Sequence, residues 1–399
     1  GKGANGVFST GASAVCYMTN DTILCDSTGS HGVDATVAAK MILKNVVITT
    51  HGNSASAAIS TDKGGGTILC TLVTANSTGT GSPAIYSTGT ITAVNCVLNG
   101  PGSEGGVIEG ANSITLVNST MSGGLKGCLL YQSMSGDAAG VKPEFSITGG
   151  SFTASAGPLF YTTNANSQIT AKGATLSAMS DTFMRADSNK WGTPGSNGGT
   201  ATFTADSQSF SGYIVADAYS NINLAMKNSS GYTGAINPSN KAKSIKLTMD
   251  ATSSWGLTAD SYIDTMSDAG ISGTTASNIT GNNHNVYYTS AASSSLGGKT
   301  YTLTNGGCLL PVGGTCTNTT MIENESVRSL SASSLSSIMT ATGHVAFSPL
   351  YSDKTKIVGL YNLAGKQLSV KTFKKNEVNV RADFGASDGA YIIKILGIK

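Results

Sequence analysis

The feature that most constrains this chain is a short pattern that recurs between residues 20 and 250. Residues 91–100 read ITAVNCVLNG and residues 114–123 read ITLVNSTMSG, so Asn95 and Asn118 occupy the same place 23 residues apart. In each copy an alternating apolar run leads into the Asn and a second run leaves it, which indicates two strands with one buried face each. Because Asn tolerates the left-handed backbone region, we predict a sharp corner between the two strands.

The same corner recurs along the chain at spacings of 22–33 residues. The predicted corner ladder consists of Asn20, Asn45, Asn95, Asn118, Gly149, Gly173, Asp206, Asn228 and Asp250. Only the copy at residues 67–77 lacks an Asn, Asp or Gly at this place. A fixed unit with loops of variable length is typical of a solenoid. We expect Asn95 and Asn118 to take left-handed conformations and to hydrogen-bond to neighbouring corners through buried amides.

A second apolar row lies between the corners and in register with them. Its members are Val7, Val33, Ala58, Ile85, Ile108, Leu130, Phe160, Met184 and Val215. Two or three short strands per coil of 22 or more residues predict an all-β fold, a right-handed parallel β-helix of about 11 coils over residues 1–311. Helical repeats do not fit, because a 3.6-residue period is absent and Gly, Ser and Thr are abundant. Residues 261–311 are expected to form the terminal turns and to cap the stacked strands.

Composition restricts the classes of partner. The chain is 39% hydrophobic and 12% charged with a net charge of +2, so no strong attraction to nucleic acid or anionic membrane is expected. No apolar run approaches the length of a membrane span. The chain enters the repeat at once, from which we expect a mature or trimmed chain whose export signal is not shown.

The seven cysteines cannot all be paired. Cys308 and Cys316 flank a Gly-rich loop and can form a local bridge, whereas Cys96 sits at an apolar alternation position. Most of the cysteines are therefore expected to be free and buried. Neither the cysteines nor His31, His51, His284 and His344 show the spacing of a metal site, so no metal and no cofactor is predicted.

The character of the chain changes after residue 311. Residues 312–345 are rich in Thr, Ser and Asn and suit a linker leading into a C-terminal domain. Residues 346–399 are basic and strand-like, with expected strands at 360–368, 378–384 and 389–397, and form the core of a small β-sandwich whose domain spans about 320–399.

This tail resembles the C-terminal sorting domain of type IX secretion substrates from Bacteroidota, in which an aliphatic-x-Tyr-Asn/Asp-x-x-Gly-Lys/Arg/Gln hairpin precedes a closing Gly-x-Tyr-Ile/Val-Ile/Val-Lys strand. The matching residues are Leu360, Tyr361, Asn362, Gly365, Lys366, Gly389, Tyr391, Ile392, Ile393 and Lys394. The Asn-Pro pair common near the start of such domains is missing. The resemblance implies recognition by the outer-membrane type IX machinery and an extracellular or cell-surface location. An ordinary accessory β-sandwich is the alternative.

The solenoid resembles the broad pectin-lyase-like β-helix superfamily, which contains lyases, glycosidases, adhesins and surface proteins without catalysis. A lyase of this fold needs acidic residues for calcium and a Lys or Arg as base. The only Arg before residue 311 is Arg185, and the candidate catalytic set is Asp181, Arg185, Asp187 and Lys190. The even spacing of the first three places them on one face of an extended strand. The alternative is an outward ion-pair cluster next to a loop.

The residues that follow the inner apolar row are expected to point outward. Those considered as a carbohydrate-binding strip are Tyr86, Glu109, Tyr131, Tyr161 and Arg185, with the loops 131–144 and 186–199 as walls. Stacked tyrosines that merely stabilise neighbouring strands are the alternative.

Two classes of function stay open. The first is a non-enzymatic surface protein, namely an adhesin, a carbohydrate-binding protein or a structural component. It would bind a polysaccharide or a neighbouring cell surface, with self-association as a further option. The second is a polysaccharide lyase or glycoside hydrolase around Arg185, with calcium required only for the lyase.

Overall fold

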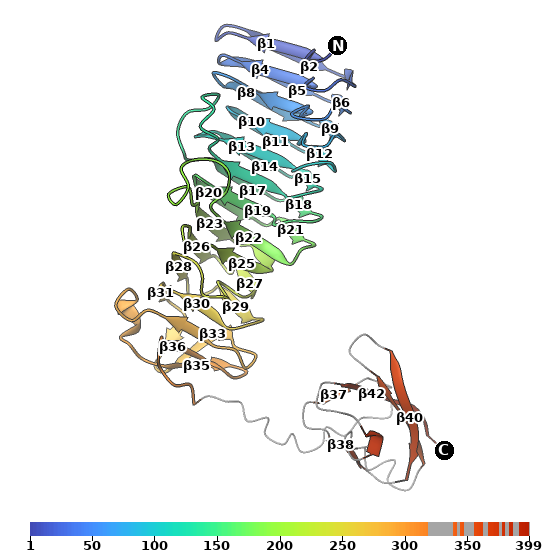
Figure 1. Ribbon diagram of the computed structural model, residues 1–399, viewed down its shortest axis with the longest axis vertical. Helices are drawn as coiled ribbons and strands as arrows, with labels where there is room; N and C mark the ends of the chain where they lie inside the picture. Colours follow the sequence, from blue (N-terminus) through green and yellow to red (C-terminus); the bar gives the residue numbers. More distant parts are fainter. Residues whose placement is uncertain are drawn as a thin grey trace. The chain divides into compact units, whose positions relative to one another are not determined.

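The computed structural model describes residues 1–317, 338–340, 344–346, 355–361, 366–374, 377–379, 383–385 and 391–398. The chain divides into two compact units, Gly1–Thr319 and Thr320–Lys399. The first unit is a parallel β-solenoid of about 13 turns, stacked from β1, drawn in blue, to β36 (Figure 1). The predicted all-β parallel β-helix is therefore confirmed, with about 13 turns rather than the expected 11. Within the described part of the chain, no helix is long and apolar enough to cross a membrane.

Each of the first coils contributes one strand to each of three parallel sheets, which we name sheets A, B and C. Sheet A contains β1 (Val7–Thr10), β4 (Val33–Thr36), β7 (Ile59–Thr61), β10 (Ile85–Ser87), β13 (Gly106–Glu109), β16 (Cys128–Tyr131), β19 (Phe160–Thr163), β22 (Thr182–Ala186) and β25 (Tyr213–Ala216). Sheet B contains β2 (Val15–Thr19), β5 (Ala39–Lys44), β8 (Gly66–Thr71), β11 (Thr90–Val94), β14 (Ser113–Val117), β17 (Glu144–Thr148), β20 (Asn166–Lys172), β23 (Thr200–Asp206), β26 (Asn221–Lys227), β28 (Ser244–Met249) and β31 (Thr265–Asp268). Sheet C contains β3 (Thr22–Cys25), β6 (Val47–Thr50), β9 (Thr74–Ser77), β12 (Val97–Gly100), β15 (Thr120–Gly123), β18 (Ser151–Ala154) and β21 (Thr175–Ala178).

The last coils share a fourth sheet, sheet D, which turns around the end of the solenoid. Its order is β24 (Ser209–Ser211), β27 (Gly231–Gly234), β29 (Ser254–Leu257), β33 (Thr275–Thr280), β35 (Tyr301–Thr304), β36 (Cys308–Pro311), β34 (Val286–Tyr288) and β30 (Ser261–Ile263), with β32 (Ile271–Ser272) beside β33. The β35–β36 pair is antiparallel and joins the two halves of the sheet. The short 3-10 helix Ser294–Leu296 buries Leu296 against the core. Residues 261–311 thus close the end of the stack, as expected.

The corners between sheets B and C are left-handed at most of the predicted positions. Positive φ angles of 47–63° occur at Asn20, Asn45, Asn95, Asn118, Gly149, Gly173 and Asn228. Each Asn backbone amide on the early corners donates to the next coil, as Asn95 does to the Val117 carbonyl at 2.9 Å. Leu72 has a φ of 56° in the copy that lacks Asn, Asp and Gly. The backbone corner is therefore a property of the coil, and Asn is its preferred but not its required occupant.

Three details of the corner prediction are wrong. Asp206 and Asp250 do not have the predicted left-handed backbone conformation. Near Asp206, the positive φ angle is found at Ser207 instead. Both carboxylates still bond to the intervening Asn228, at 2.8 Å from its Nδ2 and 2.6 Å from its backbone amide. The amides of Asn95 and Asn118 are exposed, because the corner projects away from the core. Two further left-handed corners occur in the terminal coils at Asn282 and Asn305, whose side chains are joined at 2.8 Å.

The core changes from aliphatic to aromatic along the axis. The early coils bury Ile, Val, Ala, Met and Leu side chains. From the middle coils onward a continuous column of rings fills the interior at centroid separations of 4.8–5.9 Å, consisting of Phe145, Phe152, Phe160, Phe183, Phe203, Phe210, Tyr232 and Trp255. Cys308 and Cys316 form a disulfide, and Cys25, Cys70, Cys96 and Cys128 are free and buried, whereas Cys16 is partly exposed.

The C-terminal unit contains an antiparallel sheet. Its order is β37 (Ile338–Thr340), β42 (Tyr391–Ile398), β39 (Lys356–Tyr361) and β40 (Gln367–Phe373), and β38 (His344–Ala346) pairs separately with β41 (Glu377–Asn379). Leu360 and Tyr361 end β39, Lys366 precedes β40, and Tyr391, Ile392, Ile393 and Lys394 begin β42. Asn362, Gly365 and Gly389 of the predicted sorting signal lie outside the described residues.

Candidate functional site

Two of the longest insertions of the solenoid follow strands of sheet A. Residues 132–143 separate β16 from β17, and residues 187–199 separate β22 from β23. Both loops leave the carboxyl ends of sheet A strands, close to the positions predicted from the sequence. Side chains on the outer face of this sheet therefore lie beneath or beside long loops rather than on a bare sheet.

The expected row of exposed tyrosines is corrected in two respects. Tyr86 is paired with Val107, and Leu129 is paired with Tyr161, so aliphatic residues separate the tyrosines along the axis. The actual register is shifted by two residues from the predicted one at both places. The side chains of Tyr131 and Tyr161 are only 7% and 6% exposed.

The tyrosines pack into a small apolar cluster outside the main core. Val107, Leu129, Tyr131 and Tyr161 form it, with Tyr86 and Trp191 at its edge. Trp191, from the 187–199 loop, covers Tyr131 at a centroid distance of 4.5 Å. Because these rings are covered, they do not offer the flat sugar-stacking surface that exposed rings would.

Glu109 lies within the same region and is 1% exposed. Its Oε2 accepts hydrogen bonds from the hydroxyls of Tyr86 at 2.6 Å and Tyr131 at 2.8 Å. Its Oε1 accepts from the hydroxyls of Ser133 and Ser135, both in the 132–143 loop. The carboxyl group therefore ties this loop to the sheet, which is a structural arrangement.

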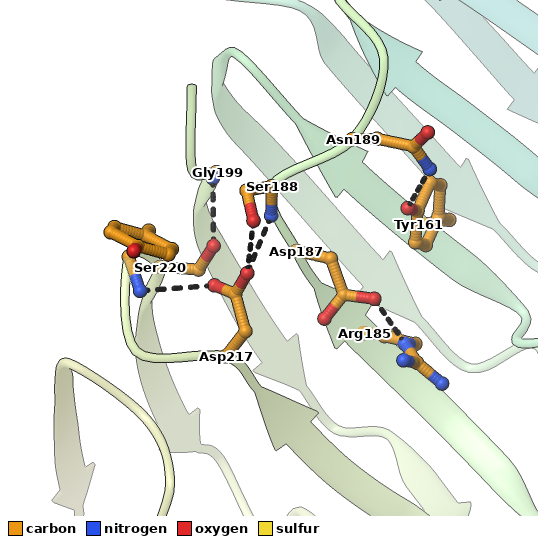
Figure 2. A network of polar contacts seen from close by, with 9 residues as sticks. Tyr161, Arg185, Asp187, Ser188, Asn189, Gly199, Asp217 and Ser220 are labelled. Carbon is orange, nitrogen blue, oxygen red and sulfur yellow. Dashed lines mark hydrogen bonds and ion pairs between the residues drawn. The ribbon is translucent and has the colours of Figure 1, made fainter. Parts of the chain in front are cut away.

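Arg185 is the only member of the predicted strip with a largely exposed side chain (51%). Its Nε donates to the Asp187 carboxylate two residues along the chain, as Figure 2 shows. Asp181 does not share their face, because it is exposed in a left-handed turn before β22 and a bulge follows at Thr182–Met184. The Lys190 ammonium lies over the Trp191 ring, 4.7 Å from its centroid.

Asp217 joins this group from the next coil, although it was not predicted. Ala186 is paired with Ala216 on the adjacent strand, and neighbouring strands lie about 4.8 Å apart. Asp187 and Asp217 directly follow these two alanines, so they lie side by side at the ends of the strands. The Ser188 amide donates to Asp217 at 2.8 Å, the Ser188 hydroxyl donates to the same oxygen, and the Tyr219 amide donates to the other at 3.1 Å. The recurrence of Ala-Asp in FMRAD and YIVAD, 30 residues apart, is the sequence signal that would have found it.

The environments of the two carboxylates differ. Desolvation raises the pKa of Asp187, and the Arg185 guanidinium offsets this only in part. Desolvation also raises the pKa of Asp217, but the hydrogen bonds from Ser188, Ser220 and the backbone amides outweigh it and lower the pKa below its ordinary value. A pair of carboxylates with opposite pKa shifts is a feature of acid–base sites.

These side chains line a pocket of about 260 Å³. Its walls are formed by Arg185, Asp187, Val215, Ala216, Asp217, Asn237, Pro238, Ser239 and Lys241. Two cationic and two anionic side chains therefore surround one hollow, in a chain that is only 12% charged.

A second polar cluster lies near the other end of sheet A. One potential ligand atom from each of His31, Asp34 and Asp62 lies within 4.8 Å of the others. Desolvation and the charge of Asp62 raise the pKa of Asp34 to about 7, and desolvation lowers the pKa of His31. The sequence shows no metal motif here because Asp62 comes from the next coil, so only the stacking brings it to the pair.

Comparisons with known protein families, with curated proteins and with solved structures found no match for this chain.

Proposed function

We propose that this chain is an exported cell-surface protein that binds an acidic polysaccharide in the pocket around Arg185, Asp187 and Asp217. A parallel β-helix is compatible with surface and carbohydrate-related proteins. The observation that carries the proposal is the convergence of Arg185, Lys241, Asp187 and Asp217 on one hollow of a weakly charged solenoid.

The pocket suits a sugar chain that carries carboxylate groups. Among the described residues, the Arg185 guanidinium has no hydrogen bond beyond its Nε contact with Asp187, and its other N–H groups can donate in pairs to a carboxylate. Lys241 also lines the pocket, is exposed and supplies a second cation. Asp217 and Asp187 accept hydrogen bonds from sugar hydroxyls. The pocket lies outside the buried tyrosine cluster, so binding does not rest on ring stacking.

Export rests on the tail. The resemblance of Leu360, Tyr361, Lys366 and the strand from Tyr391 to a type IX sorting signal supports passage through the outer-membrane type IX machinery. The antiparallel pairing of β39 with β40 and β42 is compatible with such a domain. Under this proposal the solenoid works outside the cell, as an adhesin or carbohydrate-binding surface component.

The test is retention of the full chain on immobilised polygalacturonate, with a neutral glucan as reference. Loss of a charge-assisted hydrogen bond costs about 1.5–3 kcal/mol, so Arg185→Ala should weaken retention about tenfold or more. Lys227→Ala is the matched control, because it removes an exposed ion pair with Asp206 (3.5 Å) and neither residue lines the pocket. Equal retention of the Arg185→Ala variant and the control would refute the assignment of the site.

A second candidate function is polysaccharide cleavage at the same place. The opposite pKa shifts of Asp187 and Asp217 favour it, since a glycoside hydrolase uses one carboxyl as acid and another as base or nucleophile. A lyase would instead use Arg185 as the base, with calcium bound to the substrate and the acidic residues. Release of reducing sugars would indicate hydrolysis, and release of unsaturated sugars that depends on calcium would indicate a lyase. Retention without either product supports binding alone.

A further inference from the structure

We propose that His31, Asp34 and Asp62 form a binding site for a divalent transition-metal ion of the zinc type. The site lies on the second and third strands of sheet A, apart from the Arg185 pocket and independent of its function. One potential ligand atom from each side chain lies within 4.8 Å of the other two.

The orientation of Asp34 points to a missing partner. Asp34 lies in β4 between Phe8 of β1 and Ser60 of β7, and its side chain is only 3% exposed. Its Oδ2 accepts a hydrogen bond from Asn5 Nδ2 at 3.0 Å, whereas its Oδ1 is buried with no hydrogen-bond partner among the described residues. A buried carboxylate oxygen without a donor is costly, so a ligand is expected there.

His31 shows the same deficiency. Its Nδ1 is also buried without a hydrogen-bond partner in the described part of the chain. Asn5 fixes the geometry of the pair, because its Oδ1 accepts from the His31 backbone amide at 3.0 Å while its Nδ2 holds Asp34. Asn5 is therefore an outer residue that orients both ligands from the neighbouring coil.

Asp62 completes the set from the third coil. It directly follows β7, and its Oδ1 accepts from the Lys63 amide at 2.8 Å. Two carboxylates facing each other repel unless a proton or a cation lies between them. No ion pair of Asp34 or Asp62 with Lys, Arg or His occurs among the described residues, so a bound dication would neutralise the two charges.

The ligand types select the class of metal. One imidazole with two carboxylates suits zinc and neighbouring transition metals, whereas calcium takes six to eight oxygen ligands. Zinc binds such ligands at about 2.0–2.2 Å in a tetrahedral arrangement, which places two ligand atoms about 3.3–3.6 Å apart. From a spacing of up to 4.8 Å the side chains must therefore close in by about 1 Å when the ion binds. Three protein ligands leave a position open to water.

The test is zinc binding to the full chain after chelator treatment, measured by isothermal titration calorimetry and by metal content after gel filtration. We expect one equivalent of zinc per chain and a rise in melting temperature with zinc. Asp34→Asn keeps the size and the hydrogen bond from Asn5 but removes a charged ligand, and it should weaken zinc binding at least tenfold. His31→Ala should have a similar effect.

The matched control is His51→Ala. His51 Nδ1 contacts Asp26 Oδ1 at 2.7 Å on an early coil, but no third ligand joins this exposed pair among the described residues. Its loss should leave zinc binding unchanged. Circular dichroism checks that each variant is folded. The proposal is overturned if the wild-type chain binds no zinc, if Asp34→Asn binds as well as wild type, or if calcium or magnesium binds in preference to zinc.

Discussion

Replacing Phe160 by Ala tests whether the aromatic column sets the stability of the middle coils. Phe160 is fully buried, and its ring contacts more rings of the column than the rings at either end of the column do. Its ring centroid lies 5.3 Å from Phe145, 5.5 Å from Phe152, 5.6 Å from Phe183 and 5.9 Å from Phe203. The substitution removes four ring contacts from one point of the core.

The expected cost follows from these contacts. Truncation of a buried Phe to Ala costs about 3–5 kcal/mol, depending on how far the surroundings collapse into the cavity. Each aromatic pair adds about 0.5–1.5 kcal/mol beyond the area that it buries. The strands on both sides of Phe160 are held in register by parallel pairing, which limits collapse. We therefore expect a loss of about 4–5 kcal/mol in the free energy of unfolding.

The assay is urea unfolding followed by a probe close to the column. A solenoid can unfold in parts, so the signal must report on the affected coils. Trp255 lies at the end of the column, 5.8 Å from Tyr232 between ring centroids, and its fluorescence can be isolated in a Trp191→Phe background. Phe8→Ala is the matched control, because Phe8 is 55% exposed on the first coil and should change stability by only about 0.5 kcal/mol. If both variants unfold at the same urea concentration, the column does not stabilise the middle coils.

Three other predictions follow from the corners and the tail. Leu72→Asn should raise the free energy of unfolding by about 0.5–1 kcal/mol in the same denaturation assay, because Leu72 has a left-handed backbone and is 52% exposed. The control Leu24→Asn, at an exposed position of β3, should bring no gain. Desolvation raises the pKa of Asp250, but hydrogen bonds from Asn228, Thr252 and Ser253 outweigh it and lower the pKa to about 2. Its stabilisation is therefore complete above about pH 4 and is lost as the pH falls toward 2, so Asp250→Asn should flatten the pH dependence of the melting temperature over that window. Deletion of residues 320–399 should leave the solenoid folded but retained in the periplasm of a type IX-competent host; surface display of the truncated chain would contradict the sorting assignment.

The sequence alone was enough to predict the coil. Side-chain direction along a strand has a period of two residues and is set locally, so the inward direction of Ile85, Ile108 and Phe160 could be assigned without knowing their neighbours. Val215, which was also expected inside, faces outward beside Arg185, and Ile214 is buried in its place. The corners were predictable for the same reason, because a left-handed residue is a local backbone requirement. Leu72 occupies one of these corners, which shows that stacking with the flanking coils can impose the left-handed conformation on a residue that does not favour it.

Only the tertiary structure decided which coil positions meet. A register shift of two residues keeps inside and outside unchanged but alters every neighbour along the axis, which is why Tyr86 is paired with Val107 rather than with Glu109. The tyrosines were predicted to form an exposed surface, but they lie in a cluster covered by the 187–199 loop. This burial also depends on a part of the chain that is distant in the sequence. Asp217 beside Asp187, and Asp62 beside His31 and Asp34, come from different coils, so their approach depends on how loops of unequal length return the chain to the stack.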